Sequence, residues 1–486
     1  MRFAESSETI LARLGALRDA DAPTHGGHVL SYVYDPGVAE LDALAAEAVR
    51  MMQPVNGLDP TTFGSVAVLE RELIGFTREL LNGDDDVVGT VTSGGTESCL
   101  LAVKTARDAW LAAHGAEPGT ARPRLVAPVT VHAAFQKAAH YFGLELDLAP
   151  VLPSGVVQAA ELIARLGDDV ALVVVSAPSY PHAGLDPVVE VAAAAETQGI
   201  PVHVDACIGG LALPFWPDLP DWDFRVPGVT SISADLHKYG YAPKGASVLL
   251  QRGRDRQRLQ YFATARWPGY PVVNSTLLGS KSGGPLAAAW AIVHALGREG
   301  FAELAAQTRE ATLALLETID GIEGLRVVGE PTGPLFSVAS DDAVPAERRV
   351  DPHVWADAAK GEGWILQTQP GLVQADGSHL PHTTHLTVTP VTASVLDELQ
   401  PALVRAADAV RGTPRPDISA LLGALPPLQG LPDSETAAAL LGGFGIGGSG
   451  ALPDEFAPLI AAIEALPAPL AERLLVELLA RLVEPR

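Results

Sequence analysis

Two residues of this sequence stand at the ends of apolar segments, where a charged side chain needs a chemical reason. Asp205 closes the apolar segment 201–205, and Lys238 follows the segment 229–233. A buried carboxylate is costly unless it meets a cation, such as a pyridinium N–H. A lysine amine in a partly buried pocket loses its charge more readily and can then form an imine. The plain alternatives are an Asp that caps the next turn and a lysine on the surface.

Residues 92–98, Thr-Ser-Gly-Gly-Thr-Glu-Ser, lie between an expected strand and an expected helix. Small residues let the backbone approach an anion, and a helix N-terminus offers it free N–H groups. Gly95 and Thr96 are therefore candidates for binding a phosphate group, although an ordinary capped helix start fits the same residues equally well. His132 opens another expected helix at a strand end. There an imidazole can stack on a flat ring, but a single histidine is more often structural.

The order of these motifs along the chain resembles that in a known enzyme family. The stretches SGGTES (93–98), VHAAF (131–135), VDACIGG (204–210) and SISADLHKYGYAPKG (231–245) resemble the fold-type I pyridoxal-phosphate (PLP) enzymes of the group II decarboxylase set. The similarity is greatest to the sphingosine-1-phosphate lyase-like enzymes and extends over about residues 25–410. It implies pyridoxal 5'-phosphate as cofactor and an α/β fold of the aspartate aminotransferase type.

The resemblance also assigns roles to residues that would hold the cofactor. It implies that the phosphate is bound by Gly95 and Thr96, that His132 stacks on the ring, that Asp205 pairs with the pyridine nitrogen and that Lys238 binds the cofactor covalently. Further cofactor contacts are expected from Ser233, His237 and Ser280. Ser280 belongs to the segment 278–284, which resembles the one that a partner subunit contributes in a homodimer with shared active sites.

The reaction is less closely defined than the cofactor, because PLP stabilises a carbanion whichever bond at Cα breaks. Tyr34 and Lys244 resemble active-site residues of the lyases, and His237 is a candidate proton shuttle. These residues favour retro-aldol cleavage of a phosphorylated amino alcohol into an aldehyde and ethanolamine phosphate. Amino-acid α-decarboxylation and a catalytically degenerate PLP-binding scaffold are the alternatives. An aminotransferase would need an arginine for the substrate carboxylate, which the sequence does not place.

Asp59 departs from the family pattern. The family motif Asn-x-x-His-Pro reads Asn-Gly-Leu-Asp-Pro at residues 56–60. If this position lies near the substrate, a carboxylate there repels a phosphate or carboxylate group, whereas the family imidazole can act as an acid or base. The identity of the small-molecule amino substrate therefore stays open. Lys244 also has a plain alternative, since it would serve equally as a surface cation.

The elements that must position these residues follow from hydrophobic patterning. Apolar segments at 87–92, 125–131, 170–176, 201–205, 229–233 and 246–251 alternate with helical patterns at 97–114, 134–142 and 187–198. This alternation predicts an α/β domain with a mainly parallel sheet, in which ligands bind at the carboxyl ends of the strands. We expect an N-terminal helical segment (1–85), a large PLP-binding domain (86–300), a smaller α+β domain (301–412) and a helical extension (413–486).

Composition narrows the class of partner. The chain of 486 residues carries a formal net charge of −25, which should repel nucleic acid and anionic membranes. Two cysteines, Cys99 and Cys207, cannot build a disulfide framework or a cysteine-rich zinc site, and no metal is expected. The N-terminus lacks an apolar signal core, and no integral membrane segment is expected. These features predict a cytoplasmic protein.

Overall fold

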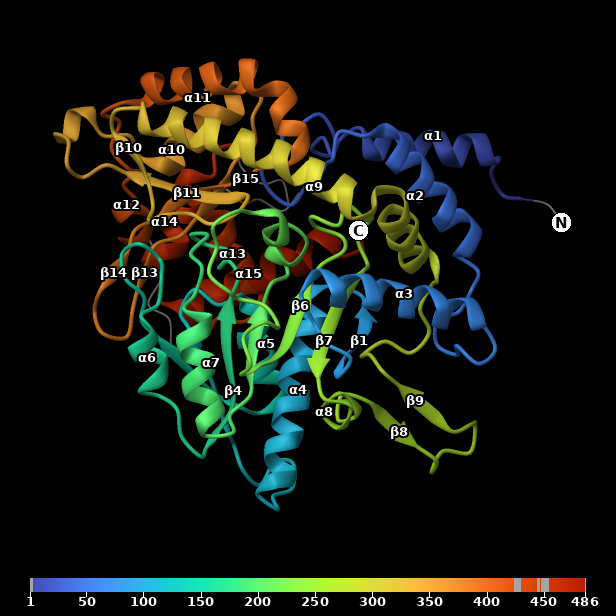
Figure 1. Ribbon diagram of the computed structural model, residues 1–486. Coiled ribbons are helices and arrows are strands. Elements are labelled where there is room, and N and C mark those ends of the chain that lie inside the picture. The colour runs from blue at the N-terminus through green and yellow to red at the C-terminus, as the bar shows by residue number, and fades with distance from the viewer. Residues whose placement is uncertain (1–2, 424–429, 444–445, 447–453, 486) are drawn as a thin grey trace.

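The computed structural model describes residues 3–423, 430–443, 446 and 454–485 (Figure 1). Its largest unit is a seven-stranded sheet with the order β1-β7-β6-β5-β4-β2-β3. The strands are β1 (Val87–Thr92), β2 (Arg124–Pro128), β3 (Glu145–Ala149), β4 (Val170–Ser176), β5 (Val202–Asp205), β6 (Val229–Ala234) and β7 (Ser247–Arg252). Only β7 runs antiparallel to its neighbours, so the remaining six strands share one direction. The expected α/β class with a mainly parallel sheet is confirmed.

Both faces of this sheet are covered, which explains why its strands are apolar throughout rather than alternating. Leu125, Leu172 and Val174 belong to a core cluster with α4 (Gly95–Ala113) and α5 (Ala133–Phe142). Val173 and Val175, on the opposite face, belong to the core that contains residues of α7 (Val188–Thr197) and α3 (Gly64–Leu80). Every residue of β4 is buried. Successive side chains of one strand thus fill two different cores.

The smaller sheet has four antiparallel strands in the order β10-β11-β15-β12. Its strands are β10 (Leu325–Val327), β11 (Leu335–Ser340), β12 (Gln367–Gln369) and β15 (Thr383–Thr387). The helices α10 (Pro352–Gly361) and α11 (Leu396–Val410) pack with it around a core that includes Phe336, Trp355 and Leu386. Two short hairpins, β8 (Phe262–Thr264) with β9 (Val272–Asn274) and β13 (Leu372–Val373) with β14 (His379–Leu380), project from the two units.

A long helix joins the two units. α9 (Gly284–Asp320) packs against α2 (Ala39–Met52) and continues to the small sheet (Figure 1). Gly297 interrupts it with φ 55° and ψ −173°, a conformation that glycine adopts without the Cβ penalty. The expected division at residue 300 therefore falls inside a helix, next to a kink. The short helices of the large unit are α6 (Ala159–Ile163) and α8 (Arg254–Arg258).

Local details differ from the sequence patterns at two strands. β3 has no counterpart among the expected strands, because its residues Glu-Leu-Asp-Leu-Ala alternate at the sheet edge and only Ala149 is buried. β2 ends at Pro128, three residues earlier than expected, because the chain turns there with Val131 N–H donating to Pro128 O over 3.0 Å. In the part of the chain that the structure describes, no helix is both long enough and apolar enough to cross a membrane.

The described part of the C-terminal extension is helical and docks on the small unit. It contains α12 (Ser419–Gly423), α13 (Ser434–Gly443), α14 (Ala457–Ala465) and α15 (Ala468–Val483). Asp357 of α10 accepts hydrogen bonds from the backbone N–H groups of Phe456 (2.9 Å) and Ala457 (2.8 Å), at the start of α14. One carboxylate thus satisfies two N–H groups that a helix N-terminus leaves without intrahelical acceptors.

We expect Asp357→Ala to loosen the extension from the small unit. Loss of such a capping carboxylate costs about 1 kcal/mol, which is roughly a fivefold change in the opening equilibrium. Limited proteolysis followed by mass spectrometry should show faster cleavage within the extension. Asp342→Ala, which removes an exposed carboxylate of the same unit, is the control. Equal cleavage rates for wild type and both variants would contradict the docking role of Asp357.

Candidate active site

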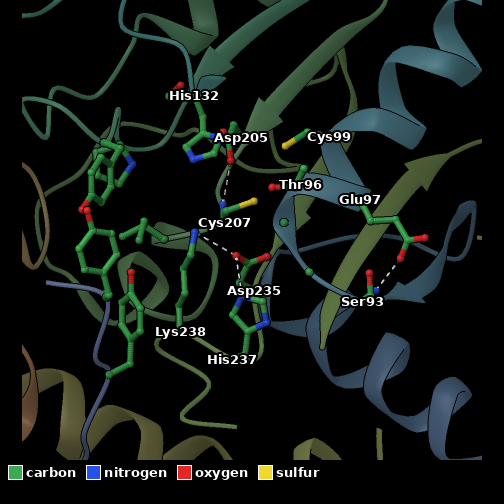
Figure 2. Close-up of a pocket in the computed structure, with 18 of the residues that line it drawn as sticks. Ser93, Thr96, Glu97, Cys99, His132, Asp205, Cys207, Asp235, His237 and Lys238 are labelled. Atoms are coloured by element: carbon green, nitrogen blue, oxygen red, sulfur yellow. Dashed lines mark hydrogen bonds and ion pairs between the residues drawn. The ribbon is translucent and has the colours of Figure 1, made fainter. Parts of the chain in front are cut away.

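A cavity of about 520 Å³ lies beside the large sheet at the carboxyl ends of β4, β5 and β6. Ser176 and Asp205 are the last residues of β4 and β5 and are paired in register, and Lys238 lies four residues beyond β6. Figure 2 shows His132, Asp205, Thr96 and Lys238 around one space, with the Lys238 side chain directed into it. Parallel strands therefore bring together residues that are distant in sequence, as expected for a ligand site in such a sheet.

The N-terminus of α4 forms one wall of the cavity. Ser93, Gly95 and Thr96 line it, as the sequence predicted for a phosphate-binding turn. A Cβ atom on Gly95 would lie 2.7 Å from the carboxylate of Asp235 and 2.7 Å from the Cys207 sulfur, so only glycine fits there. The first N–H groups of a helix have no intrahelical acceptors and carry partial positive charge. This wall is therefore suited to a phosphate.

Glu97 fixes the shape of this wall. Its two carboxylate oxygens accept hydrogen bonds from the backbone N–H groups of Ser93 (2.6 Å) and Leu277 (2.7 Å). The Glu97 side chain is buried, whereas Ser93 and Leu277 are exposed. The residue therefore ties the start of α4 to the segment that precedes Ser280.

Lys238 pairs with a residue that the sequence interpretation overlooked. Its Nζ lies 2.9 Å from the Oδ2 atom of Asp235, whose side chain is only 1% exposed. Burial alone would lower the pKa of Lys238, but the Asp235 carboxylate outweighs burial and raises this pKa well above its ordinary value. Likewise, burial opposes ionisation of Asp235, yet the charge of Lys238 holds the pKa of this carboxyl group below its ordinary value. The two groups form a buried ion pair.

Asp205 has a different environment. Its Oδ1 atom accepts hydrogen bonds from Cys207 N–H (3.1 Å) and from the Ser233 hydroxyl (3.4 Å). Ser233 is fully buried, bonds to His203 Nε2 (3.2 Å) and does not line the cavity. On β6 its side chain lies in the same layer as that of Asp205, with which it is paired in register, and a cofactor contact of Ser233 stays a prediction. Ser233 orients Asp205.

The two predicted site histidines both reach the cavity. His132 is the N-cap of α5, where its Nδ1 accepts from Ala134 N–H over 3.1 Å, and burial lowers its pKa. It is therefore a neutral, flat surface at ordinary pH. His237 accepts backbone hydrogen bonds at Nδ1 from Gly245 (3.3 Å) and Ala246 (3.4 Å), while Nε2 lies 3.4 Å from Asp235. Both nitrogens of His237 are thus close to protein groups.

Tyr34 lines the cavity, and Lys244 lies directly behind it. The Lys244 Nζ is 4.5 Å from the centre of the Tyr34 ring and donates to the His237 carbonyl oxygen over 3.0 Å. Burial, followed by the charge of Lys238, lowers the pKa of Lys244 to about 8. Burial raises the pKa of Tyr34 to about 12, so its hydroxyl keeps its proton. Lys244 therefore acts on the cavity through Tyr34 rather than lining it.

Two further cavity residues come from separate units. Tyr180, from the loop after β4, donates its hydroxyl hydrogen to the Oε1 atom of Gln367 on β12 over 2.5 Å. The Tyr180 ring also stacks on buried His385 at 4.4 Å. This contact joins the large and small units at the cavity. Neither Tyr180 nor Gln367 was among the candidate site residues of the sequence analysis.

Asp59 and Ser280 do not line this cavity. They lie together in another part of the same chain, where Asn56 Nδ2 donates to the Ser280 hydroxyl (3.4 Å) and Gly57 N–H donates to the Lys281 carbonyl oxygen (2.7 Å). The surrounding hollow of about 1150 Å³ is lined by Asp59, Lys281 and residues of α3, among others. Hydrogen bonds from the Thr61 and Thr62 side chains lower the pKa of Asp59 to about 2.

Comparison with known proteins identifies the family. Residues 63–335 match the model of the pyridoxal-dependent decarboxylase conserved domain, and residues 416–481 match that of a C-terminal putative HTH domain of pyridoxal-dependent enzymes. The chain is 39% identical over 313 residues to the sphingosine-1-phosphate lyase of Dictyostelium discoideum, covering 63% of this chain and 58% of that protein. It is 37% identical over 342 residues to sphingosine-1-phosphate lyase 1 of Rattus norvegicus, covering 69% of this chain and 59% of the relative.

Solved structures agree with this assignment. The sphingosine-1-phosphate lyase of Burkholderia pseudomallei superposes with a TM-score of 0.76 at 33% identity, over 85% of this chain and 92% of that one. A Lactobacillus brevis glutamate decarboxylase shares the fold, with a TM-score of 0.73 at 19% identity, over 86% of this chain and 96% of that one. The chain spans slightly less than three fifths of the length of the two curated lyases above. The chain belongs to the pyridoxal-dependent decarboxylase family, whose cofactor is pyridoxal 5'-phosphate.

Proposed function

We propose that the protein is a PLP-dependent carbon–carbon lyase that cleaves phosphorylated amino alcohols by a retro-aldol reaction. The observation that carries the proposal is one cavity that holds Lys238, Asp205, His132 and the N-terminus of α4 together. The choice of reaction is supported by the similarity to sphingosine-1-phosphate lyases, at 33% identity over nearly the whole of one solved lyase. Amino-acid α-decarboxylation is the second candidate, since a decarboxylase shares the fold.

The residues present fit the cofactor. The space that a Gly95 side chain would occupy is already filled by Asp235 and Cys207, so the backbone itself faces the cavity at a helix N-terminus. Gly95 and Thr96 would hold the phosphate there. Asp205, whose carboxylate is fixed by two donors, would pair with the pyridine nitrogen, and the neutral ring of His132 would stack on the cofactor. Lys238 would bind the cofactor covalently through its nitrogen.

The residues of the chain have separate tasks in the reaction. When bound, the cofactor withdraws electrons from the substrate Cα and stabilises the negative charge left there. Asp205 supports this withdrawal because a carboxylate at the pyridine nitrogen keeps that nitrogen protonated. The protonated hydroxyl of Tyr34 can donate a hydrogen bond to a substrate oxygen. Lys244 lies behind Tyr34, so a substrate phosphate that it binds must reach past the Tyr34 ring.

A homodimer with shared active sites would explain why Asp59 and Ser280 do not line the Lys238 cavity of their own chain. Asp59 and Ser280 lie on one surface of the chain, away from their own Lys238 cavity. An isologous dimer places such a patch against the other copy. The isolated helix α1 (Ser7–Arg18) supports this arrangement, because none of its residues is buried and its apolar side chains Ile10, Leu11, Leu14 and Leu17 are exposed. A helix of this length is marginal in water without a packing partner.

We expect Gly95→Ala to weaken cofactor binding. The added methyl group must displace Asp235 or Cys207, and such overpacking costs about 1–3 kcal/mol, which raises the dissociation constant roughly five- to 150-fold. Titration of the cofactor-free variant with PLP, followed by absorbance, measures this constant. Gly361→Ala is the matched control, since its Cβ would meet no atom within 4 Å. Unchanged affinity in Gly95→Ala would show that the phosphate lies elsewhere.

The proposed reaction is tested by its products. The PLP-loaded protein is offered a phosphorylated long-chain amino alcohol or a panel of amino acids, and we expect aldehyde and ethanolamine phosphate from the former. Lys238→Ala should give no product and no yellow absorbance of the lysine-bound cofactor. Release of CO2 from an amino acid without aldehyde would establish the decarboxylase instead. A yellow protein that gives neither product would be a degenerate scaffold.

Asp59→His tests whether Asp59 faces the substrate. Removing one negative charge about 4 Å from a phosphate is worth about 1 kcal/mol in water, so kcat/KM on a phosphorylated substrate should rise about fivefold or more. The increase in kcat/KM should come mainly from a lower KM, and it should be smaller at high salt. Asp85→His, at a fully exposed carboxylate, is the control. The same kcat/KM in wild type and Asp59→His would place Asp59 outside the site.

A further inference from the structure

The buried ion pair of Lys238 and Asp235 affects the covalent bond between the Lys238 nitrogen and the cofactor, called the linkage below. The Nζ and Oδ2 atoms are 2.9 Å apart, and the exposed fractions of the two side chains are 19% and 1%. Asp235 follows β6 directly and lies beneath the start of α4, where a Cβ on Gly95 would meet both of its oxygens within 2.8 Å. A carboxylate at this depth is strongly destabilised if its cation is lost.

A further cation, Lys244, acts on both members of the pair at longer range, whereas Lys238 is in direct contact with Asp235. His237 accepts two backbone hydrogen bonds at Nδ1, and its Nε2 lies 3.4 Å from the Oδ2 atom of Asp235. Tyr34 and Cys207 lie near Lys238. Burial raises the pKa of Tyr34, and a hydrogen bond with Cys99 followed by burial raises the pKa of Cys207. The carboxyl group of Asp205 lies nearby and also favours a cation at Lys238. Among the described residues, Lys238 is the one lysine or arginine within 4.0 Å of Asp235.

The charge of Asp235 then determines whether the linkage nitrogen keeps its proton. When the Lys238 ammonium joins the aldehyde carbon of the cofactor, the aldehyde oxygen leaves as water with two of the three nitrogen-bound protons. The third proton stays on nitrogen, and the positive charge beside Asp235 is conserved. If this proton also left, a buried carboxylate would lose its cation. The structure therefore favours a linkage that remains protonated.

We propose that Asp235 is a positioning residue that holds the Lys238 nitrogen in its protonated form, both before and after this nitrogen joins the cofactor. A protonated linkage carries a more electrophilic carbon, so the incoming substrate amine adds to it more readily. When the substrate has displaced Lys238, the same carboxylate retains the lysine within the cavity as an ammonium. This role requires only that the family cofactor binds at Lys238, and it holds for a lyase, a decarboxylase or a non-catalytic scaffold.

The test is a spectroscopic pH titration of the PLP-loaded protein without substrate. The protonated linkage absorbs at longer wavelength than the neutral one, so absorbance at the two bands gives the midpoint. In wild type we expect the protonated band to dominate at neutral pH and to be lost only as pH rises through an alkaline midpoint. In Asp235→Asn the midpoint should fall by about one to three pH units, because an opposite charge within hydrogen-bonding distance is removed. Asp221→Asn, in an exposed ion pair with Arg225, should titrate like wild type.

Asp235→Glu distinguishes the effect of losing the negative charge from the effect of disturbing the fold. It keeps a carboxylate in the cavity wall, so its midpoint should lie between those of wild type and Asp235→Asn. Circular dichroism and the PLP dissociation constant show whether each variant is folded and loaded. Wild-type midpoints in both Asp235 variants would overturn the proposal. If Asp235→Asn does not fold, a neutral linkage in wild type at neutral pH would overturn it as well.

Discussion

The cost of burying charge governs this structure more than any other single constraint. Lys238, Asp235 and Asp205 all line one cavity, at the carboxyl ends of the strands of the large sheet and next to the start of α4. None of these charges can be removed from water without a partner. The fold supplies partners at fixed positions: a carboxylate for the lysine, and two hydrogen-bond donors for Asp205. The apolar layers on both faces of the sheet hold these positions rigid.

Much of the architecture could be predicted from the sequence because the main strands are uniformly apolar and are separated by alanine-rich helices. The same reasoning placed Gly95, Thr96, His132, Asp205 and Lys238 at strand ends, and the structure brings them to one cavity. The elements that the patterns missed are those with weak signals. β3 lies at the sheet edge and is mostly only partly buried, and Gln367 enters the cavity from a three-residue strand.

The limits of sequence reasoning about this site have physical explanations. Ser233 pairs in register with Asp205 and bonds to its carboxylate, and motif spacing alone does not separate a cavity residue from the one that supports it. Asp235 lies within the most similar stretch, yet its role depends on a contact three residues along the chain in a turn. Asp59 and Ser280 do not line the cavity, and sequence spacing alone does not show which segments of the chain reach it.

Glu97 links two parts of the molecule that otherwise have separate tasks. One of its oxygens holds the backbone of Ser93 in the turn before α4, and the other holds Leu277 in the segment leading to Ser280. A rigid carboxylate transmits displacement between the groups bound to its two oxygens. The position of the turn before α4 and that of the segment leading to Ser280 therefore depend on one buried side chain.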